Sequence, residues 1–449
     1  MSPANRGAQE LERLYSLCEY EQTAVLASDN REAITPLEVD IQRFYKGEIP
    51  KEHVLTSVYE HTANELNTAY EKGYEKKFFA ADWTIKDNEL LNRVQNNIFA
   101  FSAAKSFTQA NELRNAVYDS KGNIVPENTF RRAVAKISTK YNKQYLQAER
   151  HQVMAAGTQG SRWVDIQESK DTHPFLEYVT ARDERVREEH RALDGIILPI
   201  DDPFWERYYP PNGWRCRCAT RKLSDREAEH KNEVYKGKEK MEMPNSETAQ
   251  KMAGKVVAKP FRHNVGTTEI FERDGHPYFK ANKEAKEMQL SAVKNYGMKK
   301  VEEIYNHPSR LSPYKGELKS KEEYNDWWAA QEQKHGKEGE GFTLVDRKNK
   351  IAATFDTKLK TKLRDTKERW NYGDEMTEVF FKPNEVWGAV VFSKNRRFGD
   401  EFFNVYIRYY EDVPLVLLVN NSGRVDSFYK LDTIKDVEKF RLGLLKQKR

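Results

Sequence analysis

The sequence contains few cysteines and no long apolar run. Only Cys18, Cys216 and Cys218 are present among its 449 residues, which excludes a disulfide framework and favours a reducing compartment. Hydrophobic residues make up 38% and charged residues 32% of the chain, and no stretch approaches the roughly 18 consecutive apolar residues of a membrane span. The start, MSPANRGAQELERLYSL, lacks the pattern of a secretion signal. We therefore expect a soluble protein without a membrane span.

Histidine is missing from the last quarter of the chain, whereas positive charge is concentrated there. The last histidine is His335. Residues 341–449 hold 22 lysines and arginines against 16 acidic residues, a net charge of +6, which leaves −1 for the rest because the whole chain carries +5. A compact basic segment favours a polyanionic partner such as RNA or DNA. A solvated basic surface is the alternative.

The first half of the chain shows mostly helical spacing. Residues 87–118 run without Gly or Pro and place apolar side chains at helical intervals, which predicts a long helix. A second helix is expected from about 127 to 154 and should end at AAGTQGS, 155–161. The segments expected next are strands at 163–167 and 175–180, a charged helix at 182–195, a loop rich in Pro, Trp and Tyr at 197–220, and a charged hinge, partly helical at most, at 224–258.

The last part alternates like a small α+β domain. A helix should end at Gly336, and FTLVDR and KIAATFD predict a hairpin. A basic helix is expected at 357–370. Further strands are expected at 377–381, 385–392, 401–410, 413–420 and 424–429, followed by a closing helix at 431–445. Helices followed by a four- or five-strand antiparallel sheet predict an α+β fold.

The middle of the chain carries a cluster of polar and sulfur-containing residues. Asp183 and Arg187 are four residues apart, so on a helix they would share a face and could pair. His190 follows on the adjacent face, and Cys216 and Cys218 lie in the loop. We expect a buried polar network that pins this loop, because irregular backbone must satisfy its hydrogen-bonding groups. A zinc site at His190, Cys216 and Cys218, with His173 as a further ligand, is the alternative.

The same region resembles the phage Mu F-like family of minor head proteins, also called head-morphogenesis proteins. The resemblance spans about residues 130–225 and rests on YNKQYLQAERHQVMAAGTQGSRW, on DERVR followed by His190 and LDG, and on PPNGWRCRC. The HNVG…IF…HPYF patch is similar to the segment that usually follows in this family. The residues that the resemblance assigns to the structural motif, without a catalytic role, are Asp183, Arg187, His190, Asp194, Cys216 and Cys218.

Several expectations follow from this resemblance. It implies a virion or prophage protein that is present in few copies near the portal and assists capsid assembly and DNA packaging. Its partners would be phage portal and capsid proteins, and its locations the phage head and the bacterial host cytoplasm. We expect no cofactor. The domains predicted are a helical N-terminal region (1–125), a small α+β Mu F-like core (126–225), a charged linker with a short ordered patch (226–290) and a C-terminal domain (291–449).

The C-terminal domain resembles the phage-associated barnase–EndoU–colicin–RelE-like nucleases. The matching pieces are KIAATFD, KPNEVW, NVYIRYY and RVDSFYKL. The resemblance implies a metal-independent endoribonuclease toxin with an immunity protein. RNA cleavage of this kind needs a base, an acid and cations at the phosphate. Relatives often place a histidine just after the strand that matches TFD, and this chain has Lys360 or Lys362 there.

The residues proposed for this chemistry are basic, phenolic or hydroxyl-bearing. RelE-like members use Lys, Arg and Tyr in place of a histidine pair. The candidate catalytic residues are Lys360, Lys362, Arg369, Tyr406, Arg408, Ser427 and Tyr429, and the candidate phosphate contacts are Lys358 and Arg364. Alternatively, the whole protein is structural and its basic tail binds nucleic acid or a protein without catalysis.

Overall fold

The chain forms two compact units in the computed structural model. The described residues are 3–16, 34–239, 242–281, 293–313, 317–366, 369–391 and 401–448. Unit 1 comprises residues 1–51, 57–77 and 104–286, and unit 2 comprises 52–56, 78–103 and 287–449. The predicted mixed α+β class is confirmed. Among the described residues, no helix combines the length and the apolar character that crossing a bilayer requires.

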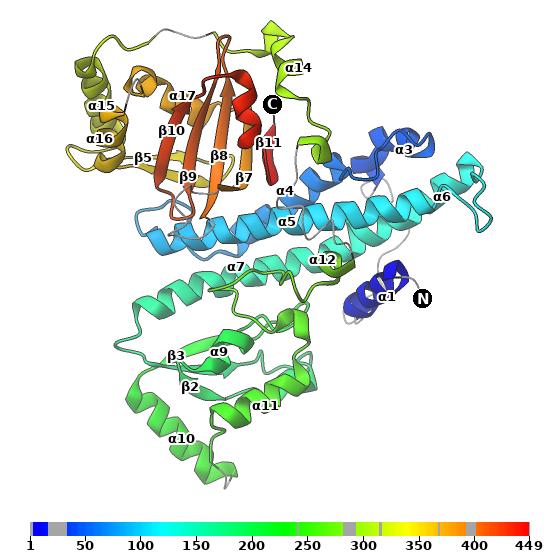
Figure 1. Ribbon diagram of the computed structural model, residues 1–449. Coiled ribbons are helices and arrows are strands. Elements are labelled where there is room, and N and C mark those ends of the chain that lie inside the picture. The colour runs from blue at the N-terminus through cyan, green and yellow to red at the C-terminus, as the bar shows by residue number, and fades with distance from the viewer. Residues whose placement is uncertain are drawn as a thin grey trace. The chain divides into compact units, whose positions relative to one another are not determined.

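Unit 1 is mainly helical (Figure 1). Its first helices are α1 (Pro3–Ser16), η2 (Thr35–Leu37), α3 (Glu38–Tyr45), α4 (Thr56–Gly73), the end of α5 (Ile85–Asn115), α6 (Glu127–Ser138), the π-helical η3 (Thr139–Tyr145) and α7 (Leu146–Glu168). Strands β1 (Phe175–Val179), β2 (Ile197–Pro199) and β3 (Ala219–Leu223) form a sheet of order β2-β1-β3 whose pairs are antiparallel. The remaining helices are α8 (Glu188–Arg191), α9 (Pro203–Tyr208), α10 (Asp225–Glu239), α11 (Ser246–Val256), η4 (Lys259–Phe261) and α12 (Pro277–Ala281).

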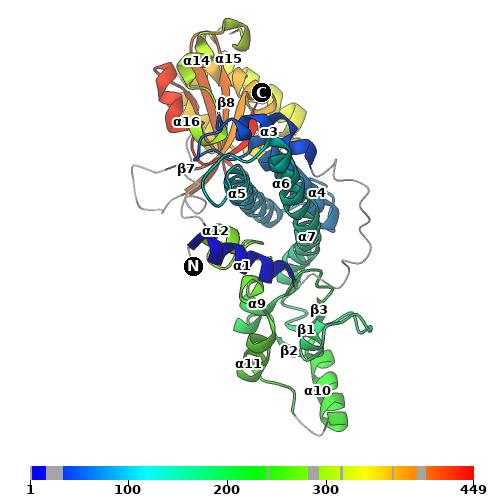
Figure 2. The same cartoon turned by 90° about the vertical axis from the view of Figure 1, so that its right-hand side faces the viewer.

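Helix α7 continues through the segment that was expected to break it. The predicted end at 155–161 and the predicted strand at 163–167 are both wrong, because both segments lie inside α7. The glycines there serve close packing. A Cβ atom on Gly157 would come within 2.7 Å of the Tyr70 carbonyl oxygen, and one on Gly73 would meet the Met154 carbonyl oxygen. Glycine therefore allows the backbones of α4 and α7 to touch (Figure 2).

The charged segments of unit 1 also differ from expectation. The predicted helix at 182–195 is wrong except for the four residues of α8. Arg182 has φ +53°, and the Asp183 carboxylate accepts a bond from the Arg185 amide at 3.1 Å, so the chain turns there instead. The hinge at 224–258 is more helical than expected, because Ser224 and Glu227 form reciprocal cap bonds at the start of α10. The end of the predicted linker, 282–290, lies outside the described residues.

Unit 2 contains a five-stranded and a three-stranded sheet. The elements are η6 (Val293–Tyr296), α14 (Val301–Tyr305), η7 (Pro308–Arg310), α15 (Lys321–His335), β4 (Gly336–Lys337), β5 (Gly341–Asp346), β6 (Ile351–Phe355), α16 (Thr357–Asp365), η8 (Trp370–Glu375), α17 (Met376–Phe381), β7 (Glu385–Val391), β8 (Glu401–Tyr409), β9 (Pro414–Asn420), β10 (Val425–Lys430), η10 (Ile434–Lys439) and β11 (Leu444–Lys448). The larger sheet has the order β10-β9-β8-β7-β11 with antiparallel pairs (Figure 1). The helix ending at Gly336 and the β5–β6 hairpin are confirmed.

Two predicted elements of unit 2 are wrong. The expected strand at 377–381 is helix α17, whose buried Met376, Val379 and Phe380 follow helical spacing. The expected closing helix at 431–445 is the short η10 followed by β11, in which Leu444 and Leu445 are buried against β7. The first error concerns a short segment whose type periodicity alone does not decide, and in the second the pairing of β11 with β7 overrides the helical spacing.

Residues 78–103 belong to unit 2 through side-chain contacts with its loops and sheet. Asn92 Nδ2 donates to the Asn421 carbonyl oxygen at 2.9 Å, and Asn404 Nδ2 donates to Asn92 Oδ1 at 3.0 Å. Gln95 Nε2 donates to the Asn349 carbonyl oxygen at 2.9 Å. The unit therefore combines an early segment with the last third of the chain. The predicted domain boundaries at 125, 225 and 290 stay predictions.

The close contact at Gly157 leads to a testable prediction. We expect Gly157→Ala to lower stability by about 1–3 kcal/mol, because the new methyl group meets backbone that cannot yield easily. Gly237→Ala in α10 is the matched control, since a Cβ there meets nothing within 4 Å. That change should stabilise the helix by up to about 1 kcal/mol. Thermal unfolding of the full chain measures both; equal midpoints for the two variants would contradict the packing argument.

Candidate functional site

One histidine and two cysteines converge in unit 1. His190 lies in α8, and Cys216 and Cys218 lie in the loop before β3. The Nδ1 atom of His190 is 3.7 Å from the Cys216 sulfur and 3.5 Å from the Cys218 sulfur. All three side chains are buried. Among the described residues they form a group whose ligand atoms lie within 4.8 Å of one another, and His173 is not part of it. Cys18 lies outside the described residues.

Hydrogen bonds hold the cysteine-bearing loop in place. Arg187 Nη2 donates to the Trp214 carbonyl oxygen at 2.6 Å, and the Trp214 indole donates to the Leu14 carbonyl oxygen at 3.0 Å. Tyr178 Oη donates to Asn212 Oδ1 at 2.9 Å. The Tyr209 hydroxyl donates to the Gln159 carbonyl oxygen of α7 at 3.0 Å. The loop is thus fixed by polar contacts from several elements, as irregular buried backbone requires.

The motif aspartates contact residues other than the expected partner. Asp183 forms two bonds with the Arg217 guanidinium, at 2.5 and 2.6 Å, and not the expected pair with Arg187. This contact lowers the pKa of Asp183 to about 2. Asp194 accepts from the Thr180 amide at 2.8 Å and from Arg182 Nε at 2.9 Å. Arg217 was not among the predicted site residues, although in RCRC it stands between the two cysteines and next to both in sequence.

A cavity of about 940 Å³ lies beside the cluster, and His190, Cys216 and Cys218 line it. Among its other lining residues, cationic side chains outnumber acidic ones. The cationic residues are Lys72, Arg185, Arg187, Arg191, Arg215 and Arg217, and the acidic residues are Glu184 and Glu188. Such a lining favours an anionic occupant.

The two thiols influence each other. The hydrogen bond between them lowers the pKa of Cys216 and raises that of Cys218, and His190 lowers the pKa of Cys216 further, while burial raises both. The first ionisation is therefore easier than that of an isolated buried thiol.

Comparison with known proteins agrees with this motif. Residues 103–221 match the family described as Phage Mu protein F like protein. The chain is 43% identical over 63 residues to the putative capsid assembly protein F of Escherichia phage Mu, which is 14% of each chain. It is 43% identical over 65 residues to the Mu-like prophage FluMu F protein of Haemophilus influenzae, 14% of this chain and 16% of that protein. No solved structure matches the chain.

The chain therefore carries a Mu F-like domain at residues 103–221. This confirms the resemblance predicted for residues 130–225 and extends its start into α5. The aligned segments span about one seventh of the length of the curated relatives.

The C-terminal candidates fall into separate groups in unit 2. Arg369 Nη1 donates to Ser427 Oγ at 3.2 Å, and its guanidinium lies 4.6 Å from the centre of the Tyr429 ring. Lys362 Nζ donates to the Asp426 carbonyl oxygen at 2.8 Å. The structure thus brings Arg369, which precedes η8, to Ser427 and Tyr429 of β10, and Lys362 contacts Asp426 of the same strand.

Tyr406 and Arg408 lie on the other face of the same sheet. Tyr406 of β8 lies opposite Leu417 of β9, which lies opposite Phe428 of β10, so the three side chains share one face of the sheet. Ser427 precedes Phe428 on β10, and neighbouring residues of a strand point to opposite faces. Tyr406 is fully buried, and its hydroxyl donates to Asp346 at 3.4 Å. Arg408 donates to the Lys382 carbonyl oxygen and lies 3.7 Å from the Glu378 carboxylate. These two side chains are therefore engaged within the fold.

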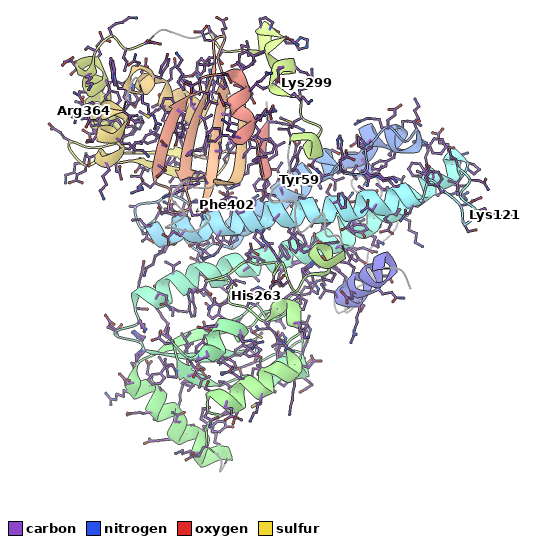
Figure 3. All side chains as sticks on the ribbon, viewed as in Figure 1. Tyr59, Lys121, His263, Lys299, Arg364 and Phe402 are labelled. Carbon is purple, nitrogen blue, oxygen red and sulfur yellow. The ribbon has the colours of Figure 1, made fainter. Side chains whose placement is uncertain are left out.

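The remaining candidates lie on or beside α16. Lys358 is exposed. The Lys360 ammonium is 5.9 Å from the centre of the Trp328 ring. Arg364, labelled in Figure 3, bonds the adjacent Asp365 at 2.9 Å. The proposed catalytic role of all these residues stays a prediction.

The patch that follows the Mu F-like domain provides a pH-dependent prediction. Burial lowers the pKa of His263 (labelled in Figure 3) to about 4, whereas a histidine in an unfolded chain titrates near about 6.5. Between these values the unfolded chain binds a proton that the folded chain does not, so stability falls as the pH decreases through this window. Between pH 7 and pH 4.5, we expect the free energy of unfolding to fall by about 2–3 kcal/mol more in the wild-type protein than in His263→Leu.

Urea unfolding at the two pH values measures this difference. His230→Leu serves as the control, because His230 is exposed on α10 and its removal should leave the wild-type pH dependence in place. Identical pH dependence of wild type and His263→Leu would show that the buried imidazole is not the group responsible.

Proposed function

We propose that the chain is a head-morphogenesis protein of a phage or prophage, located in the virion near the portal and binding portal and capsid proteins. The observation that carries this proposal is the Mu F-like domain at residues 103–221. The 43% identity to a protein named as a putative capsid assembly protein supports it. The matched segment contains the pinned loop and all the residues that line the arginine-lined cavity except Lys72 and Gly73.

Head assembly can be tested in the phage or prophage that encodes the chain. We expect deletion of its gene to reduce the number of DNA-filled heads. In a separate strain that carries a tagged copy, we expect the tagged protein to sediment with purified particles. Arg217→Asp should reproduce the defect, because it places two carboxylates together where an ion pair now holds the loop.

The double change Asp183→Arg with Arg217→Asp is the matched control, since it restores opposite charges at the same place and should restore head formation. Counting filled heads by electron microscopy, with immunoblots of the particles, measures both effects. Normal heads in the deletion strain, without the protein in the particles, would refute the proposal.

We propose metal-independent ribonuclease activity as a second candidate function for the C-terminal domain. The observation that favours it is the Arg369–Ser427–Tyr429 group beside Lys362. A guanidinium there could contact a phosphate, since its planar donors match phosphate oxygens. A toxin of this kind would require an immunity protein in the producing cell. The rival proposal is a basic module that binds nucleic acid or a protein without turnover.

This second candidate is tested with the full chain and RNA in the presence of EDTA. If the group acts on RNA, Arg369→Ala should lower cleavage at least about tenfold, as loss of a charge-stabilising donor does. Lys435→Ala, which removes an exposed cation elsewhere in the same unit, should have no effect. Intact RNA with salt-sensitive binding would favour the nucleic-acid-binding alternative, and neither binding nor cleavage would favour a protein partner.

A further inference from the structure

We propose that His190, Cys216 and Cys218 bind one zinc ion, with the fourth coordination position directed into the arginine-lined cavity. The chemistry of the donors is the first argument. Zinc in proteins is bound by thiolate and imidazole, usually in tetrahedral sites. Two cysteines and a histidine whose ligand atoms lie within 4.8 Å of one another provide three such donors.

The distances are the second argument. With Zn–S near 2.3 Å and Zn–N near 2.0–2.1 Å, a nitrogen and a sulfur on one tetrahedral zinc are separated by about 3.5–3.6 Å. The Nδ1 atom of His190 lies 3.5 Å from one sulfur and 3.7 Å from the other. The imidazole thus presents the same nitrogen to both sulfurs, which a single ion between them would explain.

The surroundings of the cluster are the third argument. The exposed fractions of His190, Cys216 and Cys218 are 5%, 7% and 5%, so bound metal would be largely protected from exchange. Arg187, three residues before His190, donates to the Trp214 carbonyl oxygen, so one bond links α8 to the loop that carries both cysteines. Ligands that are held in this way need little reorganisation to bind an ion.

The cavity distinguishes this site from a closed structural one. All three donors line the same cavity, and structural zinc sites have four protein ligands whereas three leave a position for an exchangeable ligand. The arginines that line the cavity favour an anion in that position. We infer that water or a phosphate-like oxygen completes the coordination.

The metal content of the full chain tests the ligand assignment. We expect one zinc ion per chain by mass spectrometry after reconstitution and gel filtration. Cobalt reconstitution should give a thiolate-to-cobalt charge-transfer band and visible bands typical of tetrahedral coordination. Cys216→Ser, Cys218→Ser and His190→Gln should each weaken metal binding at least about tenfold.

His151→Gln is the matched control, because His151 lines the same cavity but does not belong to the three-residue group. This variant should bind zinc as the wild-type chain does, and its cobalt form should keep the wild-type visible spectrum. A wild-type chain that binds neither ion, or cysteine variants that bind as tightly as wild type, would overturn the proposal. Circular dichroism of each variant separates loss of a ligand from loss of the fold, and only loss of metal from a folded variant counts in its favour.

The open fourth coordination position of the metal is tested separately, with phosphate. Inorganic phosphate added to the cobalt form should shift the visible bands, and Arg215→Ala should weaken this effect. Unchanged bands at saturating phosphate would overturn the open position. Because metal content is measured on the purified chain, its outcome does not depend on whether the protein acts in head assembly.

Discussion

A fully buried ion pair holds the helical frame of unit 1 together. Lys105 Nζ of α5 lies 2.5 Å from Glu149 Oε2 of α7, and the hydroxyl of Tyr15 in α1 donates to Glu149 Oε1 at 2.6 Å. Burial lowers the pKa of the lysine and raises that of the glutamate, and their mutual attraction opposes both shifts. Removing one partner from such a pair typically costs about 3–5 kcal/mol, because the other charge is left unpaired. The relative register of these three helices is therefore tightly constrained.

The cysteine-bearing loop depends on this frame. Helix α7 supplies the Gln159 carbonyl oxygen to Tyr209, and α1 supplies the Leu14 carbonyl oxygen to Trp214. Residues of the loop are thus positioned by elements that lie far away along the chain. The helical scaffold therefore fixes the position of a loop that has little regular backbone structure of its own.

The sequence predicted elements whose pattern is local. The long helix α5, the β5–β6 hairpin and the strands β7 to β10 follow periodicity and turn residues. The predictions were wrong where contacts distant in sequence determine the secondary structure. Gly157 was expected to break a helix, but it lies inside α7, where its lack of a side chain lets the Tyr70 backbone pack closely. Residues 444–448 form a strand because they pair with the edge of β7. The grouping of His190 with Cys216 and Cys218 could be suspected from residue chemistry, whereas the pairing of Asp183 with Arg217 required the turn at Arg182.

The composition of unit 2 limits how this protein could exchange its C-terminal part in evolution. Residues 78–103 contribute Asn92 and Gln95 to the unit, yet they directly precede the Mu F-like domain, whereas the rest of the sheet-bearing segment follows it. Recombination at a single point in the charged segment after that motif would transfer the strands without their partner helix and leave buried polar groups such as Asn404 without that partner. A new C-terminal sequence would have to arrive with a compatible α5 or adapt to the resident one. Residues 78–103 and the strands of unit 2 are thus expected to coevolve.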